Sequence, residues 1–145
     1  MSRHSEIITN GAVKVETYVD GDPDSRSCVV VLPSYGGDGG EDFDALAAAL
    51  AAAGHRVPRP QPRGIANSTG PMDDVTMEDL ADDVAHVIEK LGDAPAVVLG
   101  HAFGNLLARI LRPTIPTRSP ASSLQPPLVT PSILRSTRLR FERAI

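Results

Sequence analysis

The sequence of 145 residues has no tryptophan, only one cysteine and no excess of positive charge. A single cysteine forms no internal disulfide, so a disulfide-stapled scaffold is excluded, and Cys28 beside an apolar run is expected to be a buried thiol. The formal net charge is −4, which predicts no basic surface and no nucleic-acid partner. No apolar run is long enough to span a bilayer, and the N-terminal residues lack a hydrophobic signal region. We therefore expect a cytoplasmic protein without a membrane partner.

Glycine is missing from the last part of the chain, where the composition changes abruptly. All 12 glycines lie within residues 1–111, which hold 8 basic and 17 acidic residues. Residues 112–145 hold 6 basic residues and 1 acidic residue, and Pro, Ser, Thr and Arg supply 21 of these 34 positions. This break predicts a folded domain over 1–111 and a Pro/Ser/Arg-rich tail over 112–145 that does not form a packed core.

Short strands and helices alternate through the first 111 residues. The predicted strands cover residues 12–19, 28–32, 55–58 and 96–99. The predicted helices cover residues 41–54, 76–91 and 105–111. Thr76 and Asp79 predict a capping box at the start of the second helix, and apolar residues follow it at helical spacing. The alternation predicts an α/β fold with a mostly parallel sheet of βαβ units.

The stretch AVVLGHAFGN at 96–105 joins a buried strand to a helix through Gly-His-Ala-Phe-Gly. This pattern is typical of the sharp turn that presents a nucleophile in many hydrolases. Gly100 and Gly104 would let strand and helix cross closely, and Ala102 occupies the nucleophile position. The alternative is that the glycines serve close packing alone. His101, between Gly100 and Ala102, is expected to be a packed or hydrogen-bonded histidine rather than a general base.

A second glycine-rich stretch, PSYGGDGG at 33–40, follows the buried strand at 28–32. It lacks the third glycine of a dinucleotide fingerprint and the Gly-Lys-Ser/Thr of a phosphate-binding loop. The acidic residues that follow it would also repel a phosphate. His4, His55 and His86 show no metal-ligand spacing with one another or with Cys28. The sequence therefore predicts neither a cofactor nor a metal.

Residues 28–111 resemble the N-terminal half of the α/β-hydrolase fold family. The order of elements carries the resemblance, together with the segments AAAGHRV, PQPRGIANS and VVLGHAFGN. In the second segment Gln61 and Ala66 stand where the family's P-D-x-R-G-x-G-x-S loop has Asp and Gly. Pro33-Ser34 replaces the His-Gly that usually follows the first buried strand. The resemblance implies an incomplete α/β-hydrolase fold of esterase or lipase type, acting on a small ester-like substrate.

The resemblance also assigns positions of the catalytic site. Ala102 occupies the nucleophile position of the elbow, which Gly100, His101 and Gly104 complete. The oxyanion hole maps to the backbone amides of Tyr35 and Phe103. These placements are implied by the resemblance alone.

The catalytic residues that the resemblance requires are incomplete in this sequence. Catalysis in the family needs a nucleophile, an acid and a histidine in that chain order. The methyl group of Ala102 can neither attack a carbonyl nor hold an acyl intermediate. The 43 residues after Ala102 contain one acid, Glu142, and no histidine. We interpret the chain as a truncated, catalytically inactive pseudoenzyme. The alternative is a non-catalytic protein that binds a small ligand or a partner on the hydrolase scaffold.

The segment RPTIPTRSPASS at 112–123 stands where family members have a segment resembling A-x-D-H-P-D-x-V-x-G-V-V. New codons can be formed from the third base of each codon and the first two bases of the next. Under the genetic code they accommodate A-D-H-P-D-x-V-x-G-V-V without conflict. A shifted reading frame is therefore our preferred interpretation of the tail, and a natural disordered tail is the alternative.

We expect the encoding DNA to contain an open alternative frame that continues past codon 112 into a strand segment with a downstream Asp and His. Sequencing across codons 108–125 and beyond the stop codon tests this expectation. A closed alternative frame would contradict the shift and make the basic tail a genuine part of the protein.

Overall fold

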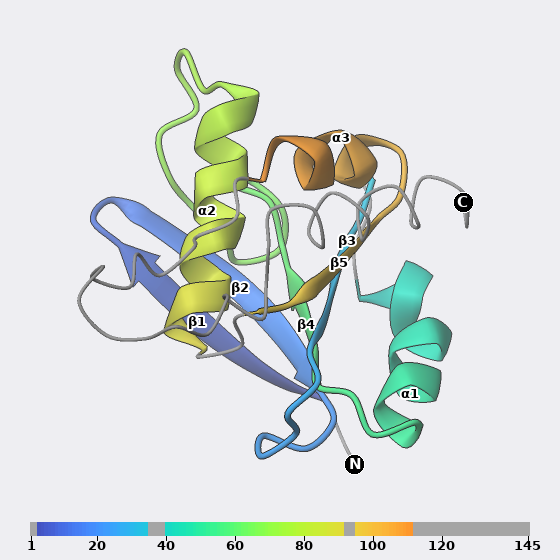
Figure 1. Cartoon of the computed structure of the whole chain (residues 1–145). Helices are drawn as coiled ribbons and strands as arrows, with labels where there is room; N and C mark the ends of the chain where they lie inside the picture. Colours follow the sequence, from blue (N-terminus) through green and yellow to red (C-terminus); the bar gives the residue numbers. More distant parts are fainter. Residues whose placement is uncertain (1–2, 35–39, 92–94, 112–145) are drawn as a thin grey trace, which may run out of the picture.

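The computed structural model describes residues 3–34, 40–91 and 95–111. The predicted tail over 112–145 and Tyr35 therefore lie outside the described residues. The elements, shown in Figure 1, are β1 (His4–Asn10), β2 (Val13–Asp20), β3 (Val29–Leu32), a 3-10 helix η1 (Glu41–Phe43), α1 (Asp44–Ala52), β4 (Val57–Pro60), α2 (Met77–Lys90), β5 (Val97–Gly100) and α3 (Phe103–Ile110).

The strands lie side by side in the order β1-β2-β4-β3-β5. Strands β1, β2 and β4 pair antiparallel, whereas β3 and β5 pair parallel. A parallel bridge between Cys28 and Arg56 joins the two groups, and the N–H of Val29 donates to the carbonyl of Arg56 over 2.9 Å. The junction sets β3 beside β4, so the five strands form one continuous layer.

The prediction of a mostly parallel sheet is wrong, because β1, β2 and β4 pair antiparallel and only β3 and β5 form a parallel pair among the described strands. Strand β1 was not predicted, since Ile8 alone among its residues is buried and the apolar alternation of a strand is missing. Asn10 pairs with Val13, so Gly11 and Ala12 form the two-residue loop of the hairpin, with Gly11 at φ +58°, a conformation that glycine adopts without strain. Strand β2 therefore runs antiparallel to β1. The predicted strand at 55–58 is confirmed as β4, two residues further along.

Helices pack against both faces of the sheet. One face carries a cluster of buried residues from β3, α2 and α3, comprising Cys28, Val30, Leu32, Leu80, Ala81, Val84, Leu107, Ala108 and Leu111. On the other face Val31 and Val57 pack against Ala47 of α1. Alternate residues of β3 thus point to opposite faces, as the pleat of a strand dictates. Figure 1 shows α1 and α2 on opposite sides of the sheet.

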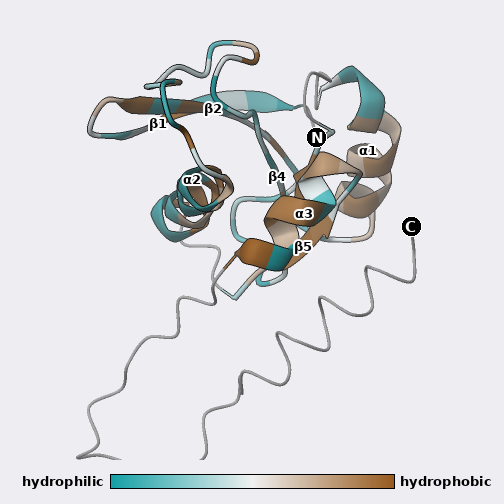
Figure 2. Cartoon of the chain, turned by 90° about the horizontal axis from the view of Figure 1, so that it is seen from above, coloured by the Kyte–Doolittle hydropathy of each residue, from teal (hydrophilic) through white to brown (hydrophobic). Residues whose placement is uncertain are grey.

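Helix α2 is amphipathic and begins as the sequence predicted. The side chain of Thr76 accepts a hydrogen bond from the N–H of Asp79 over 3.1 Å, and Asp79 accepts one from the N–H of Thr76 over 2.9 Å. This reciprocal pair confirms the capping box. Figure 2 shows the hydrophilic and hydrophobic sides of the helix. No helix in the described ranges is both long and apolar enough to cross a membrane.

The other two helices differ from the predicted bounds. The predicted helix at 41–54 divides into η1 and α1, and α3 begins at Phe103, two residues earlier than predicted.

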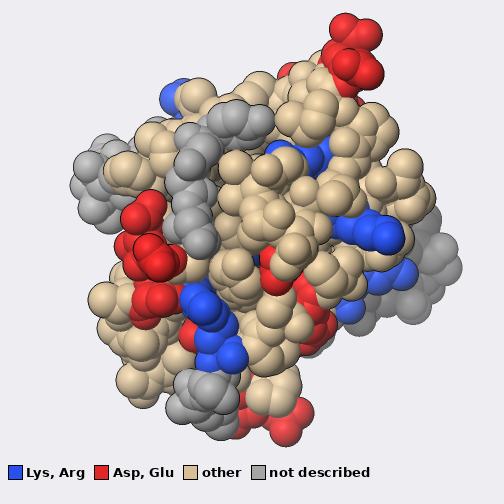
Figure 3. All heavy atoms as spheres, turned by 180° about the vertical axis from the view of Figure 1, so that it is seen from behind, with Lys and Arg blue, Asp and Glu red and all other residues tan. Residues whose placement is uncertain are grey.

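Figure 3 shows basic and acidic side chains lying close to one another on the rear face of the molecule.

Glu16 is a buried carboxylate on β2, with 6% of its surface exposed. It accepts hydrogen bonds from the hydroxyl of Ser5 over 2.7 Å and from the N–H of Asn67 over 2.9 Å. Burial alone would raise the pKa of Glu16, but the hydrogen bonds from Ser5 and Asn67 together outweigh it and hold the pKa below its ordinary 4.5. The carboxylate therefore joins the β1-β2 hairpin to the loop after β4 in its charged form.

We expect the free energy of unfolding to decline as the pH falls below about 4.5, because a carboxylate with a depressed folded-state pKa stabilises the fold only while it is ionised. Glu16→Gln should flatten this decline, which urea unfolding at a series of pH values between about 3 and 6 would measure. Glu89→Gln, at an exposed position on α2, is the matched control and should leave the slope unchanged. Equal slopes for Glu16→Gln and the unchanged chain would contradict the expectation.

Candidate functional site

A two-residue turn joins β5 to α3 at the edge of the sheet. The chain leaves β5 at Gly100 and enters α3 at Phe103, so His101 and Ala102 make the whole turn. Ala102 adopts φ +48° and ψ −112°, which residues with a Cβ rarely adopt. Such a conformation costs on the order of 1–3 kcal/mol and persists only where the surroundings impose it. The exposed methyl group of Ala102 therefore sits on a strained backbone.

Gly100 and Gly104 allow the strand and the helix to approach this closely. A Cβ added to Gly100 would lie 2.2 Å from the carbonyl oxygen of Gly104. A Cβ added to Gly104 would lie 2.3 Å from the carbonyl oxygen of Leu32 and 2.7 Å from that of Pro33. All three distances are far inside van der Waals contact with backbone atoms, so neither position accepts a side chain without a backbone shift.

The parallel pairing of β3 with β5 brings two loops together at this edge. Leu32 and Gly100 are paired residues at the carboxyl ends of the two strands. The N–H of His101 donates to the carbonyl of Leu32 over 3.1 Å, which extends the ladder by one hydrogen bond. The glycine-rich stretch after β3 and the turn after β5 therefore start next to each other, at the sheet edge where ligands bind in open α/β folds.

His101, predicted to be a packed or hydrogen-bonded histidine, is exposed at the turn. Its ring meets the ring of Phe43 edge-on, with the centroids 6.3 Å apart. Its imidazole makes no side-chain hydrogen bond to any residue that the structure describes. Among the described residues, therefore, none is an acid that orients His101 as a general base would require.

Of the two backbone amides assigned to the oxyanion hole, the structure describes only that of Phe103. Phe103 is the first residue of α3, so its N–H lies at the positive end of the helix dipole. Tyr35 lies outside the described residues. The pairing of the two amides thus stays a prediction.

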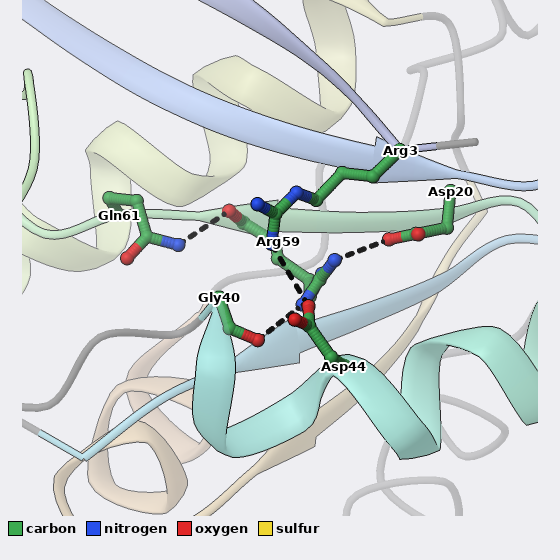
Figure 4. A network of polar contacts seen from close by, with 6 residues as sticks. All are labelled: Arg3, Asp20, Gly40, Asp44, Arg59 and Gln61. Carbon is green, nitrogen blue, oxygen red and sulfur yellow. Dashed lines mark hydrogen bonds and ion pairs between the residues drawn. The ribbon is translucent and has the colours of Figure 1, made fainter.

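Arg59 connects β4 to the end of the glycine-rich stretch, and sequence reasoning missed it (Figure 4). Its guanidinium is almost fully buried and donates to Asp20 over 2.7 Å, to Asp44 over 2.7 Å and to the carbonyl of Gly40 over 2.8 Å. Arg3 also donates to Asp44, over 3.0 Å. The hydrogen bond from Arg59 holds the pKa of Asp44 below its ordinary 3.8. The sequence signal that could have indicated a buried, paired arginine is its position between Pro58 and Pro60 in a short strand.

A small pocket lies behind the turn, between the sheet edge and the helices α2 and α3. It has about 20 Å³ of space, which is room for a single water molecule. Leu32, Pro33, Pro60, Gln61, Pro62, Arg63, Leu80, Asp83, Val84 and Leu107 line it. Within it the guanidinium of Arg63 donates to both carboxylate oxygens of Asp83, over 2.7 and 3.1 Å. This pairing raises the pKa of Arg63 above its ordinary range and offsets its positive charge.

No group of three or more His, Cys, Asp or Glu side chains that could hold a metal ion occurs within the described ranges. Cys28 is buried in the core cluster on the α2 face, which confirms the buried thiol predicted from the sequence.

Known proteins share the strand–turn–helix architecture described above. A family model described as alpha/beta hydrolase fold matches residues 28–118, more than half of the chain. No curated protein sequence matches the chain. Among solved structures, the thioesterase domain from the curacin biosynthetic pathway is 23% identical with a TM-score of 0.68, over 74% of this chain and 40% of that domain.

Two further solved structures are similar. Epoxide hydrolase A from Mycobacterium thermoresistibile is 20% identical with a TM-score of 0.68, over 75% of this chain and 34% of that enzyme. A predicted CIB-like hydrolase from Thermoplasma acidophilum is 18% identical with a TM-score of 0.68, over 77% of this chain and 56% of that protein. The chain thus spans less than two thirds of the length of each, and likeness at these identities shows the fold.

We expect Ala102→Gly to raise the free energy of unfolding by about 1 kcal/mol, because glycine relieves the strain at φ +48° and loses part of that gain as backbone entropy. Urea unfolding would measure the change. Ala48→Gly, at an exposed position inside α1, is the matched control and should destabilise by about 1 kcal/mol. Destabilisation by both substitutions would show that the turn is not strained.

Proposed function

The chain belongs to the alpha/beta hydrolase fold family, and we propose that it is a catalytically inactive member, related to enzymes that hydrolyse small ester-like substrates. The observation that carries the proposal is the conformation of Ala102, a strained turn between β5 and α3 with a methyl group at its tip. The backbone has the shape that exposes a nucleophile, and the side chain has no nucleophilic atom.

The proposed inactivity follows from what ester hydrolysis demands at this position. A serine, cysteine or aspartate side chain must attack the carbonyl carbon and hold the acyl group until water releases it. Alanine offers only carbon and hydrogen. Even an intact oxyanion hole at Phe103 and Tyr35 would polarise a bound ester without supplying an attacking atom, so no acyl intermediate would form.

The other catalytic groups also lack support. His101, in the turn itself, is exposed and has no carboxylate partner among the residues that the structure describes. The 43 residues that follow Ala102 contain no histidine and one acid, Glu142. A hydroxyl restored at residue 102 would therefore have no carboxylate-paired histidine beside it among the described residues.

A ligand-binding or interaction protein without chemistry is the other candidate function. The described pocket behind the turn has room for one water molecule. No contact of the described residues favours this candidate over an inactive hydrolase.

We expect neither the unchanged chain nor Ala102→Ser to show multiple turnovers of p-nitrophenyl butyrate above the buffer rate. Release of nitrophenol over many equivalents of protein, followed by its absorbance, is the measurement. Circular dichroism should show that both proteins are folded.

Multiple turnovers by the unchanged chain would overturn the proposed inactivity. Turnover by Ala102→Ser alone would show that only the nucleophile is missing and that a base acts on residue 102 after all.

A further inference from the structure

A serine and a histidine that are far apart in the sequence meet near the start of β3. The hydroxyl oxygen of Ser27 lies 2.7 Å from Nδ1 of His55. Ser27 is exposed and His55 is half-buried, so solvent and small molecules reach the hydroxyl. A serine hydroxyl within hydrogen-bond reach of an imidazole nitrogen is the basic arrangement of an activated nucleophile.

Backbone hydrogen bonds hold both partners in place. The N–H of Arg56 donates to the carbonyl of Ser27 over 2.9 Å, and the N–H of His55 donates to the carbonyl of Leu50 over 3.1 Å. The carbonyl of His55 packs so closely against Gly21 that a Cβ there would lie 2.2 Å from its oxygen. The two side chains therefore project from backbones that are fixed relative to each other.

This pair is separate from the turn at Ala102. Ser27 precedes β3 and Ala102 follows β5. Because β3 and β5 are parallel, residues that precede one strand and residues that follow the other lie at opposite edges of the sheet. Reactivity at Ser27 consequently does not depend on the proposed function of the turn.

We propose that Ser27 and His55 form an acyl-accepting dyad for activated esters. In the tautomer of His55 that carries its proton on Nε2, Nδ1 takes the hydroxyl proton while Oγ of Ser27 bonds to the acyl carbon. The bond from that carbon to the aryl oxygen breaks, and the aryloxide leaves with the electron pair. The proton on Nδ1 then passes to the aryloxide or to water, which leaves Ser27 acylated and His55 neutral.

The backbone around Ser27 sets the class of substrate. The N–H of Ser27 donates to the hydroxyl of Ser25 over 3.2 Å, so this amide is engaged and does not stabilise an oxyanion. Without that stabilisation the leaving group must depart easily. The dyad therefore accepts acyl groups from aryl esters and similar activated donors, and it acylates once rather than turning over.

Acetylation by p-nitrophenyl acetate, mapped by peptide mass spectrometry, tests the dyad in the full 145-residue chain. Ser25 is the internal control, because its hydroxyl donates to the carbonyls of Ser27 and Gly54 and not to a histidine. We expect acetyl-Ser27 to exceed acetyl-Ser25 by about tenfold or more.

His55→Gln should lower acetylation of Ser27 about tenfold or more, since it removes the base and keeps the serine. The matched control His4→Gln, at an exposed histidine that contacts Glu6, should leave it unchanged. Equal acetylation of Ser25 and Ser27, or acetylation confined to amines, would overturn the dyad, as would an unchanged rate in His55→Gln. If His55→Gln does not fold, the ratio of Ser27 to Ser25 in the unchanged chain decides. One equivalent of nitrophenol, released whatever residue occupies position 102, distinguishes this chemistry from turnover at the elbow.

Discussion

The close approach of the first turn of α3 to the ends of β3 and β5 is the contact on which the rest of the sheet edge depends. Gly104 lies against the carbonyls of Leu32 and Pro33, and Gly100 lies against Gly104 itself. The helix can start only where these backbones touch, so Ala102 must reverse the chain at φ +48°. The same contact directs Leu107 into the cluster that α2 and β3 share. Two residues without side chains thus determine the turn, the helix position and part of the core.

A second fixed point lies on the opposite face of the sheet. Arg59 would be costly to bury alone, but Asp20, Asp44 and the carbonyl of Gly40 accept hydrogen bonds from its guanidinium over 2.7–2.8 Å. Because Asp44 begins α1, the network ties this helix to β2 and β4 and sets where the glycine-rich stretch ends. The start of that stretch is set by Pro33 beneath α3. Backbone crowding fixes one end of it, and buried charge fixes the other.

The elements with strong local patterns could be predicted from the sequence, and the errors arose where tertiary contacts decide. The capping box at Thr76 and the apolar runs of β3 and β5 need only neighbours in the chain, although β5 is only partly buried where the sequence predicted a buried strand. Strand β1 has one buried residue, Ile8, and owes its existence to pairing with β2, so its own pattern gave no signal. The pairs Arg59–Asp44 and Ser27–His55 join residues 15 and 28 positions apart. No local spacing rule reaches that far.

The backbone conformation of Ala102 is a property of the fold, whereas any reactivity at this position depends on the side chain. A turn selected for packing alone would gain stability from glycine at 102, because glycine adopts positive φ without strain. Alanine keeps the backbone strained while its methyl group forms no bond to a substrate. The conformation persists because Gly100 and Gly104 impose it whatever the side chain between them. The two glycines thus maintain the architecture of the turn, which is a separate matter from the chemistry of the residue between them. On the function proposed above, the turn keeps the shape that presents a nucleophile, and the methyl group of Ala102 supplies no reactive atom.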